Sequence, residues 1–139
     1  MNREALIQNI LHSIGTINRE FTARGNYPFQ SYALGRSHME ILFLLSRQER
    51  SIKQLAEHLY ITSGAVTQLV DFLASKKLVV KKEDPQDKRS RLVRLTAESA
   101  STVRAFEKQY VAMLAGKFDD LTDEDLDHLY RILETMRRV

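Results

Sequence analysis

Hydrophobic residues recur with helical spacing in two short stretches near the middle of the chain. The first stretch has apolar residues at i, i+3, i+4 and i+7, which are Ile52, Leu55, Ala56 and Leu59. A second stretch follows the turn at Tyr60-Ile61 and repeats this pattern with Val66, Leu69, Val70 and Leu73. This spacing gives a helix one buried face. The pattern therefore predicts two short helices that share a core, joined as a helix-turn-helix.

Both predicted helices start with residues that can cap them. Ser51 followed by Gln54 has the spacing of a capping box, and Thr62 and Ser63 are cap candidates for the second helix. Beside the cap residue Thr62, the polar face of the second helix carries short or hydrogen-bonding residues near its N-terminus, which are Ser63, Gly64, Thr67 and Gln68. This is typical of a recognition helix, whose first turns enter the major groove and contact base edges. The alternative is an ordinary helical hairpin with a polar surface.

Two runs of branched residues follow, 78–80 and 92–95, separated by a polar segment. They predict two strands joined by a long hairpin. Residues 76–94 contain eight Lys or Arg against three acids, whereas the whole chain has a net charge of only +3. A basic hairpin directly after a recognition-type helix indicates the wing of a winged helix, in which Lys88, Arg89 and Arg91 are placed to contact DNA phosphates or the minor groove. Taken alone, this charge run would indicate a solvated loop.

These segments also carry motifs, which are Leu69-Val70-Asp71-x-Leu73, Leu78-Val79, Asp84-Pro85-x-Asp87-x-Arg89-Ser90 and Leu92-x-x-Leu95-Thr96. On these motifs the chain resembles the MarR family of winged helix-turn-helix transcriptional regulators, and the resemblance covers nearly its whole length. It implies that Arg89 reaches the minor groove at the wing tip. It also implies that Asp87 orients the Arg89 guanidinium, with Asp71 as a second acidic partner nearby.

The chain departs from the family pattern at two places. Lys77 stands where the family usually has a glycine that ends the recognition helix, and Ser99-Ala100 replace a glycine after the wing. A left-handed residue commonly ends a helix, and glycine adopts that conformation most easily. We therefore expect the helix end, and the angle at which the chain enters the wing, to differ from the family pattern.

The remaining hydrophobic pattern predicts long helices at both ends of the chain, over about 4–21, about 97–118 and from 123 onward, with a further helix from about Ser37. The expected fold is mainly α with a small β-hairpin wing: a winged helix-turn-helix with long N- and C-terminal dimerisation helices. We expect a single domain, in which residues 36–96 bind DNA and residues 1–24 and 97–139 form a homodimer. The apolar stripes of the terminal helices have more surface than a small winged-helix core can cover, which predicts the dimer. The alternative is a monomer in which these stripes fold back on the middle of the chain.

Composition and the lack of certain motifs argue against several other classes of protein. The absence of cysteine excludes disulfides and thiolate metal sites, and the four histidines are dispersed without ligand spacing, so we expect no metal and no cofactor. A zinc site assembled from distant helices is the alternative. No motif of a phosphate loop, nucleophile elbow or metalloprotease appears, so we expect no enzyme. The chain has no apolar run of membrane-spanning length and no signal peptide, which predicts no membrane partner and a cytoplasmic location.

The predicted function is sequence-specific binding of double-stranded DNA at a palindromic operator by a dimeric repressor that a small-molecule effector releases. Tyr32 and His38 are candidates for the effector pocket, with Tyr27 and Phe29 beside them, although a lone His at a helix start is commonly a cap and such aromatics are commonly core. The alternative function is a winged-helix protein-interaction module without specific DNA binding. That module would be expected to expose apolar residues on its recognition face, where this chain is polar.

Overall fold

The computed structural model describes residues 1–23 and 32–137 of the chain. The chain divides into two compact units. One unit contains residues 26–108, and the other combines residues 1–25 with residues 109–139. The division falls inside the long helix α5 (Ala97–Ala115), so the first turns of this helix belong with the middle of the chain.

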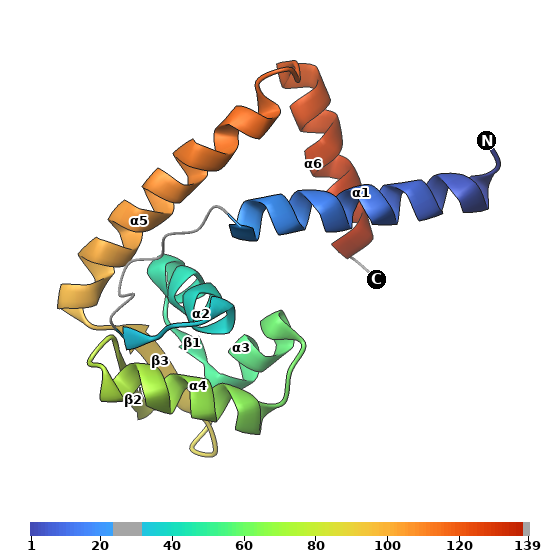
Figure 1. The fold of residues 1–139 in the computed structure, drawn as a ribbon. Coiled ribbons are helices and arrows are strands. Elements are labelled where there is room, and N and C mark those ends of the chain that lie inside the picture. The colour runs from blue at the N-terminus through green and yellow to red at the C-terminus, as the bar shows by residue number, and fades with distance from the viewer. Residues whose placement is uncertain (24–31, 138–139) are drawn as a thin grey trace. The chain divides into compact units, whose positions relative to one another are not determined.

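The middle unit is a winged helix, as the sequence predicts (Figure 1). Its elements in order are α2 (Arg36–Arg47), β1 (Arg50–Ser51), α3 (Ile52–Leu59), α4 (Ser63–Ser75), β2 (Val79–Glu83), β3 (Arg91–Leu95) and the start of α5. The strands form an antiparallel sheet in the order β1-β3-β2. The two-residue strand β1 was not predicted, because its pairing of Arg50 with Val93 is non-local and leaves no pattern in the sequence.

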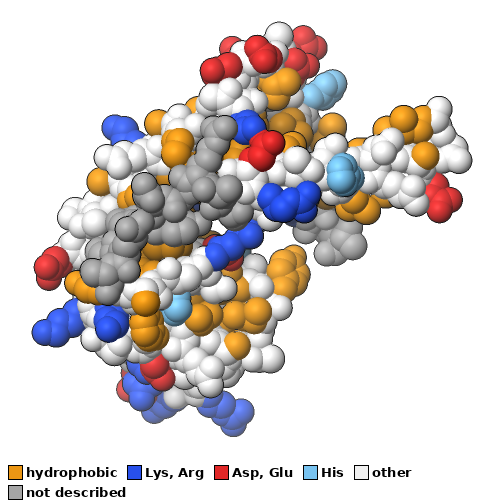
Figure 2. Space-filling model, in the orientation of Figure 1, with side chains coloured by type: hydrophobic (Ala, Val, Ile, Leu, Met, Phe, Trp, Pro, Cys, Tyr) orange, Lys and Arg blue, Asp and Glu red, His pale blue; other side chains and the backbone are white. Residues whose placement is uncertain are grey.

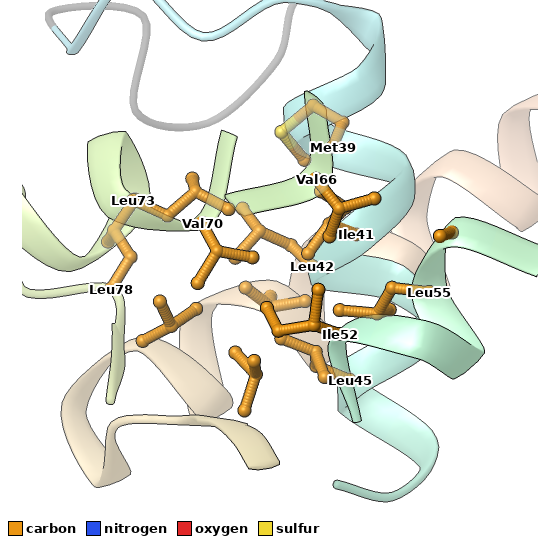
Figure 3. Packing of buried hydrophobic residues seen from close by; sticks show 14 residues of the cluster. Met39, Ile41, Leu42, Leu45, Ile52, Leu55, Val66, Val70, Leu73 and Leu78 are labelled. Atoms are coloured by element: carbon orange, nitrogen blue, oxygen red, sulfur yellow. The ribbon is translucent and has the colours of Figure 1, made fainter. Parts of the chain in front are cut away.

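The core of this unit lies between α2, α3, α4 and the sheet. The buried face of α4 consists of Val66, Val70 and Leu73, which point toward α2 residues such as Leu42 (Figure 3). The start of α5 joins the same core through the fully buried Val103, and Phe106 stacks on Phe43 of α2 with ring centroids 5.9 Å apart. Because Val66, Val70 and Leu73 pack in the core, the residues on the opposite side of α4 point toward solvent.

The caps that the sequence predicts for the two helices of the helix-turn-helix are present. Ser51 Oγ accepts the Gln54 N–H at 3.0 Å, and the Gln54 side chain accepts the Ser51 N–H at 2.9 Å. Thr62 Oγ1 accepts the Ala65 N–H at 3.1 Å at the start of α4. These local hydrogen bonds satisfy backbone donors that a helix start leaves free.

The end of α4 corrects the expectation that a helix end with Lys77 in place of glycine is shaped differently. Lys77 itself adopts a left-handed conformation, with φ of 61°. Its N–H donates to the Ala74 carbonyl at 3.0 Å, and the Leu78 N–H donates to the Leu73 carbonyl at 3.0 Å. This pair of bonds is the Schellman arrangement that usually has glycine at the left-handed position. Leu78 is then buried, and this burial and the two hydrogen bonds hold a lysine in the conformation that glycine would adopt more easily.

Lys77→Gly is therefore expected to stabilise the protein by about 0.5–1 kcal/mol, because a lysine side chain is strained at positive φ and glycine is not. The matched control is Lys76→Gly, whose φ of −92° is ordinary; there glycine should destabilise, by about 0.5–1 kcal/mol. Urea unfolding of both variants measures the effect. Equal destabilisation by both substitutions would contradict the account of this helix end.

Ser99, which replaces a family glycine, fixes the other side of the wing. Its hydroxyl is buried and donates to the Leu78 carbonyl at 2.5 Å. Thr96 Oγ1 accepts the Ser99 N–H at 3.2 Å, which caps α5, and donates to the Lys77 carbonyl at 3.0 Å. These two hydroxyls therefore hold the chain where it enters the wing against the chain where it leaves the wing.

The other unit contains α1 (Arg3–Ala23), the last turns of α5, the short 3-10 helix η2 (Gly116–Phe118) and α6 (Asp123–Arg137). Thr122 caps α6, accepting the Asp125 N–H at 3.1 Å, and the Asp125 carboxylate accepts the Thr122 N–H in return. Lys117 of η2 forms an ion pair with Glu20 of α1. No helix within residues 1–23 and 32–137 combines the length and apolar character needed to cross a membrane.

Candidate nucleic-acid interface

The N-terminal turns of α4 present a polar face to solvent. The five residues predicted there are all exposed, namely Thr62, Ser63, Gly64, Thr67 and Gln68. Gly64, Thr67 and Gln68 lie on one face because residues three and four apart are neighbours on a helix. Val66 and Val70 hold the opposite face in the core. The structure thus brings together all five predicted residues of this helix start.

The contacts of Thr67 and the space around Gly64 bear on how a ligand could approach this face. The Thr67 hydroxyl donates to the Ser63 carbonyl at 2.9 Å, so its proton is already used and its oxygen can still accept a hydrogen bond. A Cβ placed on Gly64 would have only Thr62 Oγ1 nearby, at 4.0 Å, among the described residues. The helix backbone at Gly64 is therefore open to close approach by another molecule.

The wing extends from the sheet beside α4. Strands β2 and β3 pair from Val79 opposite Leu95 to Glu83 opposite Arg91. At the tip the acids bind the backbone: Asp84 Oδ1 accepts the Gln86 N–H at 2.9 Å, and Asp87 Oδ1 accepts the Arg89 N–H at 3.0 Å. The cationic residues Lys88, Arg89 and Arg91 are exposed, and Figure 2 shows Lys and Arg side chains gathered at this end of the unit.

The two predicted wing-orienting acids have different partners from those the family resemblance implies. Asp87 accepts the backbone N–H of Arg89 and so shapes the turn. Asp71, on α4, forms an ion pair with Lys81 of β2. This contact joins the recognition-type helix to the wing strand, so both acids still bear on where the wing points.

His38 caps helix α2 in the structure. Its Nδ1 accepts the Gly35 N–H at 3.0 Å, and its ring lies 4.9 Å from the Phe72 ring of α4. Tyr32, the other predicted effector-pocket residue, is half-buried against the core, while Tyr27 and Phe29 lie outside the described residues. Desolvation by partial burial lowers the pKa of His38 below its ordinary value. The neutral imidazole is also the form that can accept the Gly35 N–H.

His38 should make stability depend on pH. Its folded-state pKa is depressed, so the unfolded chain binds the proton more readily. The stability that neutral His38 contributes is present above the pKa of histidine in the unfolded chain, about 6.5, and is lost as pH falls through its pKa in the folded protein. Charged groups near this helix start and near Phe72 include Arg36, Glu40 and Lys76.

The matched variant is His38→Gln, since a glutamine can accept the same N–H without titrating. Between about pH 7 and pH 5, the wild-type free energy of unfolding should fall more than that of His38→Gln, measured with urea at both values. An identical pH dependence of the two proteins would show that His38 does not titrate in this way.

Sequence reasoning missed the contacts that anchor the wing. Lys81 pairs with Asp71, and Lys82 Nζ lies 2.9 Å from a Glu49 carboxylate oxygen. By sequence alone, both lysines are only part of a basic run. Because side chains alternate along a strand, Lys81 and Lys82 lie on opposite faces of β2, and this alternation could have predicted that they have different partners.

Comparisons with known proteins agree with this geometry. A family model described as the MarR family matches residues 34–90. The HTH-type transcriptional regulator YdgJ of Bacillus subtilis (strain 168) is 30% identical over 105 residues, which is 75% of this chain and 64% of that protein. The HTH-type transcriptional repressor YetL of the same organism is 23% identical over 121 residues, or 82% of this chain and 72% of that protein.

A solved structure shares the fold over nearly the full chain. The transcriptional regulator BldR from Sulfolobus solfataricus superposes with a TM-score of 0.75 at 25% identity, covering 97% of this chain and 99% of that one. The chain spans about three-fifths of the length of the first curated relatives that it matches, 61%, 57% and 64%.

Proposed function

The chain belongs to the MarR family of winged helix-turn-helix transcriptional regulators, and from this premise we propose that it is a dimeric, sequence-specific repressor that binds double-stranded DNA. In this proposal a small-molecule effector releases it from a palindromic operator. The proposed role is one of binding, without a catalytic residue or a cofactor, and the proposal includes a cytoplasmic location, where the DNA partner would lie.

The observation that carries the proposal is the polar, capped and exposed N-terminus of α4. Ser63, Thr67 and Gln68 offer hydrogen-bonding groups toward a major groove, in which each base pair presents its own pattern of donors and acceptors. The Gln68 amide can donate to N7 and accept from N6 of adenine as a bidentate pair. Contact of Gln68 with phosphate or water alone is the competing role for this side chain.

The wing supplies the second contact. Lys88 and Arg91 would neutralise phosphates, and Arg89 at the tip would enter the adjacent minor groove, where a narrow groove attracts a guanidinium. The Asp87 and Asp84 hydrogen bonds to the tip backbone support this role, since they preorganise the turn that presents Arg89. The Asp71 and Lys81 pair would hold the wing in register with α4.

Exposed apolar stripes support a dimer. The α1 residues Leu6, Ile10, Ile14 and Ile17 and the α6 residues Leu129, Ile132, Leu133 and Met136 are all exposed in the single chain. A patch of this kind marks an interaction surface, and a two-fold homodimer is the commonest way to cover it. The residues concerned lie in 1–24 and 97–139, to which we assign dimerisation. A two-fold dimer would place two α4 helices at half-sites about 34 Å apart.

Gly64→Ala tests whether DNA approaches α4 closely. A methyl group there makes only an ordinary van der Waals contact, with Thr62 Oγ1 at 4.0 Å, so the protein should be stabilised by about 0.5–1 kcal/mol, since alanine favours a helix over glycine. DNA affinity should fall by about 1 kcal/mol, roughly fivefold, because the methyl group holds the backbone away from the duplex.

The matched control for Gly64→Ala is Gly15→Ala on α1. Gly15 lies off the exposed apolar stripe of that helix, since it is one residue after Ile14 and two before Ile17, and a Cβ there makes an ordinary contact with the Arg19 side chain at 3.6 Å. It should stabilise the protein and leave DNA affinity unchanged. Thermal unfolding and fluorescence anisotropy measure the two effects. Unchanged affinity for Gly64→Ala would remove the close approach from the proposal.

One observation favours a second candidate function, a protein-interaction module. Tyr60, in the turn before α4, is 93% exposed and has a positive φ of 56°, and Ile61 beside it is 38% exposed. A partner protein would bury these two side chains, and Tyr60→Asn and Ile61→Ser would then disrupt that complex while leaving DNA binding intact. If the same substitutions weaken DNA binding only, the turn belongs to the DNA interface.

A further inference from the structure

Three elements of the winged-helix unit surround a hollow of about 230 Å³. It lies where the end of α2, the end of β3 and the start of α5 meet, and it is lined by the apolar side chains of Leu45 and Leu95. Three arginines also line it, Arg47 from α2, Arg94 from β3 and Arg104 from α5. Because each arginine comes from a different element, only the tertiary fold brings them together.

The acids around this hollow are already engaged by other groups. Glu49, which also lines it, pairs with Lys82 Nζ at 2.9 Å. Glu107 accepts the Ser46 hydroxyl at 2.8 Å and lies 3.9 Å from Arg47. Within the part of the chain that the structure describes, neither Arg94 nor Arg104 pairs with a carboxylate. The hollow therefore carries uncompensated positive charge.

The Arg94 side of the hollow lies on the face of the sheet that α4 does not cover. Val93 is fully buried in the core that α2 and α4 share with the sheet. Successive side chains of a strand point to opposite faces, so Arg94 projects from the face that α4 does not cover. The described residues that line the hollow belong to α2, the turn after α2, β3 and α5, and none of them belongs to α4.

We propose that this hollow binds a small dianion that carries a phosphate or two carboxylates, with Arg94 and Arg104 as its principal donors. A guanidinium presents parallel N–H groups whose geometry matches both phosphate and carboxylate oxygens. The apolar side chains of Leu45 and Leu95 would pack against the carbon skeleton of such a ligand. The site does not depend on DNA binding and is separate from Tyr32 and His38.

The test is a titration of the full chain followed by amide NMR shifts, with inorganic phosphate in one arm and succinate in the other at constant ionic strength. At least one arm should shift the amides of residues 46–49 and 94–100 with saturation. Saturation by phosphate alone assigns a phosphate-bearing ligand, and saturation by succinate alone assigns a dicarboxylate. Linear shifts without saturation in both arms would overturn the proposal.

Three variants distinguish specific binding in the hollow from non-specific attraction of the anion to surface charge. Arg104→Gln should weaken binding about tenfold, because one charge-assisted hydrogen bond is lost, and Arg94→Gln should do the same. Lys108→Gln, one turn further along α5 and outside the hollow, removes the same charge and should leave binding unchanged. Equal weakening by Arg104→Gln and Lys108→Gln would show screening of surface charge and overturn the site.

Discussion

Leu133→Glu is expected to turn the proposed dimer into a monomer and to abolish operator binding. Leu133 lies on the apolar stripe of α6 and is 45% exposed in the single chain. Burying a leucine side chain contributes about 1.5–3 kcal/mol, and a two-fold interface contains the position twice. A glutamate there would also place a charge in an apolar contact. The dimer dissociation constant should rise about a hundredfold or more.

The matched control places the same charge on the same helix. Thr135 lies off the stripe, and its hydroxyl donates to the Arg131 carbonyl of the same helix at 3.0 Å. Thr135→Glu should therefore stay dimeric and bind DNA normally. Sedimentation equilibrium measures the assembly, and anisotropy measures operator affinity. A Leu133→Glu monomer that still binds a palindromic duplex with full affinity would refute the coupling of dimerisation to DNA binding.

Arg89→Ala is the second large expected effect. The exposed guanidinium at the wing tip is presented by a turn that Asp87 holds through the Arg89 N–H. If the guanidinium is desolvated in the minor groove, its loss should weaken DNA binding by about 1–3 kcal/mol, roughly fivefold to 150-fold. The loss should depend on sequence, since groove width does.

Lys88→Ala is the neighbouring control for Arg89→Ala. As a phosphate contact it should lower affinity for all sequences alike and flatten the salt slope by about one unit. Both variants are measured by anisotropy at fixed salt on several duplexes. An Arg89→Ala affinity within about twofold of wild type would remove this residue from the minor groove.

The elements of the fold were predictable where the determining interactions are local. Helical spacing of apolar residues located α3 and α4, and the caps at Ser51, Thr62 and Thr122 followed from residues three apart. The polar face of α4 was predictable for the same reason, because burying one side of a helix exposes the other.

What the sequence did not reveal depends on tertiary contacts. Lys77 is left-handed because the burial of Leu78 and two hydrogen bonds to α4 require it, whereas the residue type alone argued against it. Asp71 pairs with Lys81, because α4 and β2 are neighbours in space. The arginines of the hollow come from three different elements, and no spacing rule joins Arg47, Arg94 and Arg104.

The central claim is specific binding of a palindromic duplex, and one competition experiment tests it most directly. Duplexes are first selected from a random pool, and the wild-type affinity for the best palindrome is then compared with that for a shuffled duplex of equal length and composition, at two salt concentrations. The account predicts a preference of about a thousandfold or more for the palindrome, with both affinities falling as salt rises. Equal affinities for the two duplexes would contradict it, because the basic wing would then bind phosphates without any reading of sequence by α4.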